Sequence, residues 1–155
     1  MAIYLYKNDL PDDLDLGSVV AIDCETMGLN PHRDRLCLVQ LSSGDGNAHL
    51  VQISLGQSEA PNLAGMLTDP EVLKLFHFGR FDIAALYHSF GALAAPVYCT
   101  KIASKLVRTY TDRHGLRNLC QELIEVDIFK PVSYTHLRAH ETYLLISYAV
   151  FCLKN

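Results

Sequence analysis

Short apolar runs separated by turn residues open the chain and predict β-strands. Residues 18–23 form an apolar run that ends in an acid, which is typical of a buried central strand. Residues 36–42 and 48–54 are also strand-like, and the Gly-Asp-Gly-Asn stretch at 44–47 between them indicates a hairpin turn. The pattern therefore predicts three consecutive strands that form an antiparallel meander.

After residue 60 the pattern changes to helices that alternate with short strands. Helices are expected to begin near Asn62 and Asp69 and to cover residues 82–90, 100–110 and 115–124, with short strands at 75–78 and 97–99. In the helix at 100–110, the residues expected to face the core are Ile102, Ala103, Leu106 and Val107, with the lysines facing solvent. This succession predicts an α/β fold with a sheet of mixed direction, flanked by helices.

Composition narrows the class of protein. The 155 residues suffice for one domain with a hydrophobic core, and 50% of them are hydrophobic, as in ordinary globular proteins. No apolar run approaches the roughly 20 residues needed to cross a bilayer, and the N-terminus lacks the features of a signal peptide. The five cysteines form no Cys-x-x-Cys pair. We therefore expect a cytoplasmic protein with reduced thiols and no membrane partner.

The charge distribution is uneven. The formal net charge of −4 counts mildly against a nucleic-acid-binding protein. Cationic side chains nevertheless gather in one short segment, with Asp112 as the one acid among them: Lys101, Lys105, Arg108, Arg113, His114 and Arg117. A solvated helix face and a surface for phosphate groups both fit this segment, and the sequence leaves the choice open.

Three acids are candidates for metal chemistry. Asp23 and Glu25 lie two positions apart at the end of a buried strand, so their side chains point to the same face. Two such acids are costly to bury unless they are solvated, paired or bound to a cation, and their hard oxygen ligands suit Mg²⁺ or Mn²⁺. Asp82 opens the helix at 82–90, where its simplest role is to stabilise the helix N-terminus.

Two segments resemble the first two motifs of the DEDD exonucleases, in particular the ribonuclease D branch. The first reads Asp-Cys-Glu-Thr-Met-Gly-Leu at 23–29, and the second reads His-Phe-Gly-Arg-Phe-Asp at 77–82. The resemblance extends over about residues 3–128. It implies a ribonuclease-H-like fold with two Mg²⁺ or Mn²⁺ ions. It also implies hydrolysis of nucleic acid from a single-stranded 3′ end, with RNA favoured over DNA.

The resemblance also implies roles for individual residues. Asp23 would bridge both ions, Glu25 would hold one of them, and Asp82 would hold the other. The implied substrate-binding residues are Thr26, Met27, Gly28, Leu29, His77, Phe81, Lys101, Lys105 and Arg108. Core packing is an equal alternative for His77 and Phe81.

The end of the chain does not fit the domain. Residues 132–142 match one reading frame of a transposase-based sequencing adapter, and residues 146–154 match the other end of the same library molecule. We therefore expect a truncated exonuclease domain at 1–130, incomplete at its C-terminus, and a non-native tail at 131–155. A genuine C-terminal helix is the alternative.

The family's third motif, Tyr-x-x-x-Asp or His-x-x-x-x-Asp, is missing from the sequence. Asp112 and Asp127 lack the preceding partner at the required spacing. The expectation is therefore split: the parent protein is an exonuclease, and this exact chain is inactive or severely impaired. Two other hypotheses stay open, a non-catalytic nucleic-acid-binding module and a structural protein whose acids serve as helix caps and surface charges.

Overall fold

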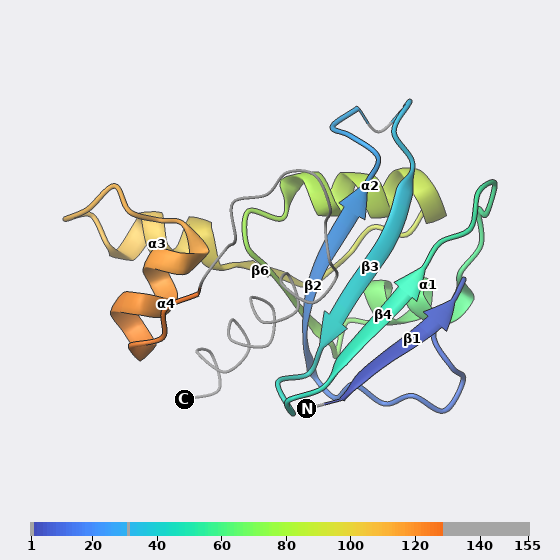
Figure 1. Ribbon diagram of the computed structural model, residues 1–155, viewed down its shortest axis with the longest axis horizontal. Helices are drawn as coiled ribbons and strands as arrows, with labels where there is room; N and C mark the ends of the chain where they lie inside the picture. Colours follow the sequence, from blue (N-terminus) through green and yellow to red (C-terminus); the bar gives the residue numbers. More distant parts are fainter. Residues whose placement is uncertain (1, 31, 129–155) are drawn as a thin grey trace.

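The computed structural model describes residues 2–30 and 32–128, which form a mixed β-sheet and flanking helices (Figure 1). The strands are β1 (Ile3–Lys7), β2 (Val19–Thr26), β3 (Leu36–Ser42), β4 (Ala48–Gln52), β5 (Leu73–Phe76) and β6 (Val97–Cys99). The helices are α1 (Pro61–Thr68), α2 (Arg80–Phe90), α3 (Thr100–Val107) and α4 (Leu116–Ile124). The predicted division at residues 130 and 131, and the alternative of a C-terminal helix, lie outside the described residues.

The sheet has the strand order β1-β4-β3-β2-β5-β6. Strands β2, β3 and β4 pair antiparallel, so the predicted meander is confirmed. Parallel strands extend it on both sides, β1 beside β4, and β5 with β6 beside β2. The predicted α/β fold with a mixed sheet is therefore confirmed. Strand β1 was not predicted, because it is an exposed edge strand whose pairing partner lies far along the chain.

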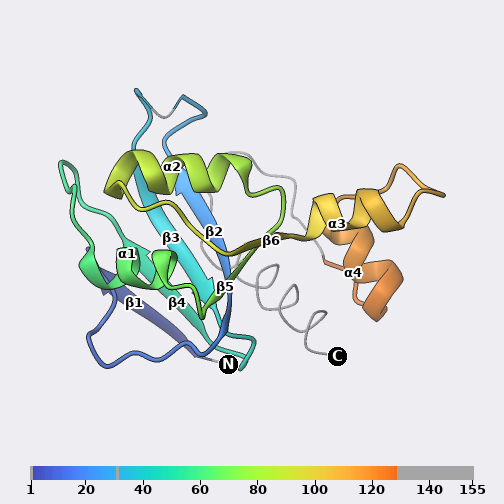
Figure 2. The ribbon, with the colours of Figure 1, turned by 180° about the vertical axis from the view of Figure 1, so that it is seen from behind.

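The two faces of β2 have different surroundings. Val20, Ile22 and Cys24 point into the main core, which α1 and α2 cover (Figures 1 and 2). Because side chains alternate along a strand, Asp23 and Glu25 lie on the opposite face. The central position of β2, paired on both edges, explains its apolar sequence and fixes where the two acids emerge.

Two differences from the sequence prediction lie between residues 69 and 78. The prediction of a helix that begins at Asp69 is wrong. Residues 69–72 form a turn in which Asp69 Oδ1 accepts the Glu71 N–H at 2.9 Å. Strand β5 covers Leu73–Phe76 rather than 75–78, because Phe78 adopts a left-handed backbone conformation with φ of 65°. No helix in the described part of the chain is long and apolar enough to cross a membrane.

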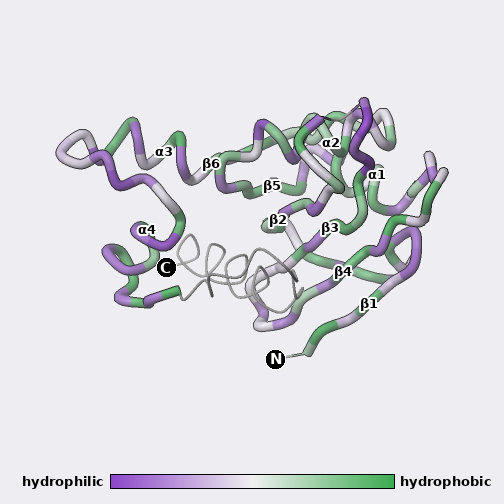
Figure 3. The backbone as a smooth tube through the Cα atoms, turned by 45° about the horizontal axis from the view of Figure 1, so that its top comes forward, coloured by the Kyte–Doolittle hydropathy of each residue, from purple (hydrophilic) through white to green (hydrophobic). Residues whose placement is uncertain are grey.

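Helices α3 and α4 lie to one side of the sheet, beyond β6 (Figures 1 and 2). Each carries both hydrophobic and hydrophilic stretches (Figure 3). The expectation that Ile102, Leu106 and Val107 face the core is wrong, since their exposed fractions are 56%, 74% and 78%. Among the described elements, α3 packs chiefly on α4 and β6, so this apolar side has no sheet beneath it.

Gln40 is an unusual residue of β3. It pairs in register with Asp23, its exposed fraction is 1%, and neither polar atom of its side chain has a hydrogen-bond partner among the described residues. A buried amide without partners lowers stability. We expect Gln40→Met to raise the free energy of unfolding by about 1 kcal/mol, as measured by urea denaturation.

The matched control is Gln52→Met on β4, where the glutamine is exposed and the same substitution should have little effect. A loss of stability in the Gln40 variant would contradict this account of the buried amide.

Candidate active site

The candidate site begins at the C-terminal end of β2. Asp23 and Glu25 are both half-buried there, and they pair with Gln40 and Leu38 of β3. The pairing register shifts between Glu25 and Thr26, where the strand leaves the sheet. The two carboxylates therefore lie at the point where an ordered strand gives way to a loop, as the sequence predicts.

Asp82 reaches this point from the first turn of α2. Its exposed fraction is 8%, and its Oδ1 accepts the backbone N–H of Cys24 at 3.1 Å. Cys24 is the residue between the two acids of β2, so this hydrogen bond brings a third carboxylate to the same short segment. Asp82, which is distant in sequence, thus becomes a neighbour of Asp23 and Glu25 in space.

The electrostatics of the site reflect this crowding. Burial raises the pKa of Asp82 from 3.8 to about 6; the Cys24 hydrogen bond opposes the rise and the negative charge of Glu25 adds to it. Burial also raises the pKa of the Cys24 thiol, and the charges of Asp82, Asp23 and Glu25 raise it further. The segment therefore carries a concentration of negative charge that a cation would relieve.

The donor set suits a hard divalent cation, because all three side chains offer carboxylate oxygens. The acids are neighbours but do not converge on one point. In residues 2–30 and 32–128, no group of three or more His, Cys, Asp or Glu side chains is arranged to hold a metal ion. Mutual repulsion between the carboxylates is a physical reason for them to stay apart. A bound cation would attract all three and draw them together.

Gly79 allows α2 to approach β5 closely. A Cβ atom at this position would lie 2.3 Å from Cβ of Phe76, which is buried. The sequence motif contains Gly79, but only the contact explains it. We expect Gly79→Ala to lower the free energy of unfolding by about 2 kcal/mol, because the helix that carries Asp82 must shift, as urea denaturation would measure.

Gly65→Ala in α1 is the matched control, since nothing lies within 4 Å of a Cβ there. In a helix with room for the methyl group, this substitution should leave stability unchanged or raise it. Equal effects of the two substitutions would contradict the role given to the Gly79 contact.

The residues after Glu25 form the start of the loop between β2 and β3. The Thr26 hydroxyl donates to the carbonyl oxygen of Gly28 at 2.6 Å. Met27 and Leu29 are exposed, with exposed fractions of 70% and 85%. The structure therefore places two apolar side chains in solvent immediately beside the acids.

The second motif, at residues 77–82, carries two further predicted site residues. His77 and Phe81 are half-buried, and His77 Nδ1 lies 2.9 Å from Oγ1 of Thr100. The Nζ of Lys101 lies 3.9 Å from the centroid of the exposed Phe78 ring, a cation–π contact. Lys105 is exposed on α3. Neither lysine forms an ion pair among the described residues.

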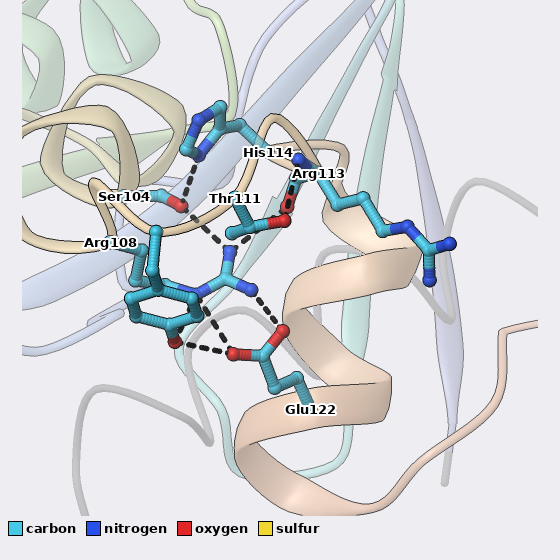
Figure 4. Close-up of polar contacts among 7 residues, drawn as sticks. Ser104, Arg108, Thr111, Arg113, His114 and Glu122 are labelled. Carbon is cyan, nitrogen blue, oxygen red and sulfur yellow. Dashed lines mark hydrogen bonds and ion pairs between the residues drawn. The ribbon is translucent and has the colours of Figure 1, made fainter.

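Arg108 does not belong to an exposed row with the lysines. Its exposed fraction is 5%, and Figure 4 shows its guanidinium between α3 and α4. It donates to Ser104 Oγ at 3.0 Å and to the carbonyl oxygen of Arg113 at 2.9 Å, and it forms an ion pair with Glu122. The expected phosphate contact is thus not available to Arg108 in this structure, because its donors already bind Ser104, Arg113 and Glu122.

Comparison with known proteins identifies the family. The family model described as 3′–5′ exonuclease matches residues 7–149. A curated ribonuclease D from Gluconacetobacter diazotrophicus is 35% identical over 111 residues, which are 72% of this chain and 28% of that protein. This chain thus spans less than a third of the length of that relative.

Solved structures agree with this result. Brucella melitensis NrnC, described as bound to pGG, is 51% identical, with a TM-score of 0.88; the match covers 99% of this chain and 79% of that one. The catalytic core of RRP6 from Trypanosoma brucei shares the fold, with a TM-score of 0.71 and 19% identity. The match covers 88% of this chain and 40% of that one.

The chain belongs to the 3′–5′ exonuclease family. The predicted ribonuclease D resemblance and ribonuclease-H-like fold are both confirmed.

Proposed function

We propose that the parent of this chain is a metal-dependent 3′–5′ exonuclease that hydrolyses single-stranded nucleic acid, with RNA favoured over DNA. The main structural support for this proposal is the hydrogen bond from the Cys24 N–H to Asp82, because it gathers three carboxylates at the end of β2. Membership of the exonuclease family supports it, and the ribonuclease D relatives support RNA as the substrate class.

The proposed cofactor is Mg²⁺ or Mn²⁺, with two ions in the intact parent. Asp23, Glu25 and Asp82 would hold the ions through their carboxylate oxygens. A structure of Brucella melitensis NrnC described as having bound Mg²⁺ supports a divalent cation. Two such ions supply Lewis-acid activation of the attacking water and of the scissile phosphate when bound.

The remaining residues would hold and orient the 3′ end. Met27 and Leu29 offer apolar surface for the terminal nucleotide, because they are exposed beside the acids. Thr26 and Gly28, which share a hydrogen bond, would support this surface, and His77 and Phe81 would support the site from the second motif. Lys101 and Lys105 would attract the phosphate backbone. The description of Brucella melitensis NrnC as bound to pGG supports an oligonucleotide ligand.

We further propose that residues 1–130 are the exonuclease domain and that residues 131–155 are a non-native tail. The third family motif would then be absent, so one metal site lacks a carboxylate and the attacking water lacks its positioning group. The alternative is a non-catalytic nucleic-acid-binding module, which the missing third motif would favour for this chain.

The test is a gel assay with 5′-labelled RNA and DNA oligonucleotides in Mg²⁺. This chain should bind the oligonucleotides and shorten them from the 3′ end slowly or undetectably. Any shortening should vanish with EDTA or with Asp23→Asn, and it should be blocked by an inverted 3′-terminal nucleotide. Rapid shortening by this exact chain would refute the proposed truncation, and absence of binding would refute the proposed substrate class.

A further inference from the structure

The loop between β2 and β3 holds two large apolar side chains in solvent. Met27 and Leu29 are more exposed than most residues of their kind in folded proteins. Because they flank a glycine, the direction in which both point depends on the backbone at residue 28. A contact that fixes this backbone therefore also fixes the apolar surface beside the acids.

Asp34 makes that contact from the other end of the loop. Its exposed fraction is 9%, although its sequence neighbours 32 and 33 are exposed. Its Oδ2 accepts the backbone N–H of Asn30 at 3.0 Å, and its own N–H donates to the Asn30 carbonyl oxygen at 2.7 Å. Nε and Nη2 of Arg33 donate to its two oxygens at 2.7 and 2.8 Å. The carboxylate thus ties the two sides of the loop together.

Gly28 lies directly against this carboxylate. A Cβ atom at Gly28 would lie 2.3 Å from Oδ2 of Asp34, so any side chain at this position would displace the carboxylate. On the strand side, Met27 N–H donates to the Arg35 carbonyl oxygen at 3.0 Å. The backbone between the two apolar side chains is therefore fixed between a carboxylate and the start of β3.

The charge of Asp34 is stable under ordinary conditions. The hydrogen bond from Arg33, followed by that from the Asn30 N–H, lowers the pKa of Asp34 to about 2. The carboxylate therefore accepts these hydrogen bonds in its charged form, which strengthens them.

We propose that Asp34 is a positioning residue for nucleotide binding: it holds the loop so that Met27 and Leu29 form one preformed apolar surface for the terminal base. This inference rests on the proposed function, since it assigns the surface to the nucleotide of the same site. Asp34 itself touches neither the nucleotide nor the three acids. Its effect is on binding, because a backbone at residues 27–30 that is already held in place loses less conformational entropy when the ligand binds.

The experiment measures binding of a 5′-labelled single-stranded RNA by fluorescence anisotropy in Mg²⁺, with the full chain. Asp34→Asn should weaken binding about fivefold or more, and Met27→Ala should do the same. The double variant should be little worse than either single one, because both changes remove the same surface. The affinity of Asp34→Asn for Mn²⁺ should equal that of the unaltered chain, which a general collapse of the site would not allow.

Asp45→Asn is the matched control, since Asp45 caps the loop between β3 and β4 in the same way and accepts the Asn47 N–H at 2.9 Å. It should bind RNA normally. If Asp34→Asn does not fold, Gly28→Ala disturbs the same contact from the other side and should also weaken binding. Normal binding by a folded Asp34 or Gly28 variant, with binding weakened by Met27→Ala, would overturn the inference alone. Failure of the unaltered chain to bind RNA would overturn the proposed function as well.

Discussion

Asp82→Asn should stabilise the metal-free chain by about 2 kcal/mol at about pH 8, although it removes a proposed metal ligand. The asparagine can still accept the Cys24 N–H, but it carries no charge. The pKa of Asp82 is about 6 in the folded chain against an ordinary 3.8. This difference corresponds to an upper limit of about 3 kcal/mol of destabilisation when the carboxylate is ionised.

The pH dependence has a definite sign. Between about pH 4 and pH 6 the folded chain binds more protons at Asp82 than the unfolded chain does, so the free energy of unfolding falls as pH rises through this window. The gain from Asp82→Asn should therefore be near zero below about pH 4 and constant above about pH 7. Urea denaturation across this range measures it.

Asp127→Asn serves as the control, because Asp127 is exposed and its pKa is lowered by its hydrogen bond with Arg117. Asp127→Asn should lower the free energy of unfolding only slightly at any pH. If Asp82→Asn were destabilising at about pH 8, the ionised carboxylate would be making favourable structural contacts. That result would contradict its assignment as a metal ligand whose charge is unbalanced without the ion.

Replacing the proposed non-native tail should have the largest effect on activity. We expect a chimera, in which residues 132–155 are replaced by the matching segment of Brucella melitensis NrnC, to shorten 5′-labelled RNA at least about 100-fold faster than this chain. The physical reason is that the new segment would supply the proposed fourth carboxylate for the metal site and a neighbouring side chain to orient the attacking water. The gel assay described above measures the rate.

The same chimera with Asp23→Asn is the control, and it should lose the gained activity. Comparison of the two chimeras also distinguishes the exonuclease hypothesis from the hypothesis of a non-catalytic binding module. A chimera that folds and binds RNA without shortening it would favour the non-catalytic binding module.

The sequence predicted the parts of this fold that depend on local pattern. The three-strand meander followed from apolar runs and one strong turn, and the shared face of Asp23 and Glu25 followed from the alternation of side chains in a strand. The start of the helix that carries Asp82 was predicted within two residues. The family resemblance, rather than the pattern, suggested that Asp82 joins the pair.

The remaining features depend on contacts between distant residues. No sequence pattern indicates that Asp82 accepts the backbone N–H of Cys24, which lies far from it in sequence. Arg108 has the helical spacing of an exposed cation, but Glu122 on the next helix binds it. The outward apolar side of α3 was mispredicted because an amphipathic pattern shows that a face is apolar and not whether a partner covers it.

Calorimetric titration with Mn²⁺ at about pH 8 tests the central claim most directly, because metal binding requires ionised carboxylates. The claim is that Asp23, Glu25 and Asp82 belong to one cation site. We expect saturable binding by this chain, weakened about tenfold or more by Asp23→Asn and by Asp82→Asn, and unchanged in the remote variant Asp45→Asn. Absence of saturable binding, or equal affinity in all four proteins, would contradict the account.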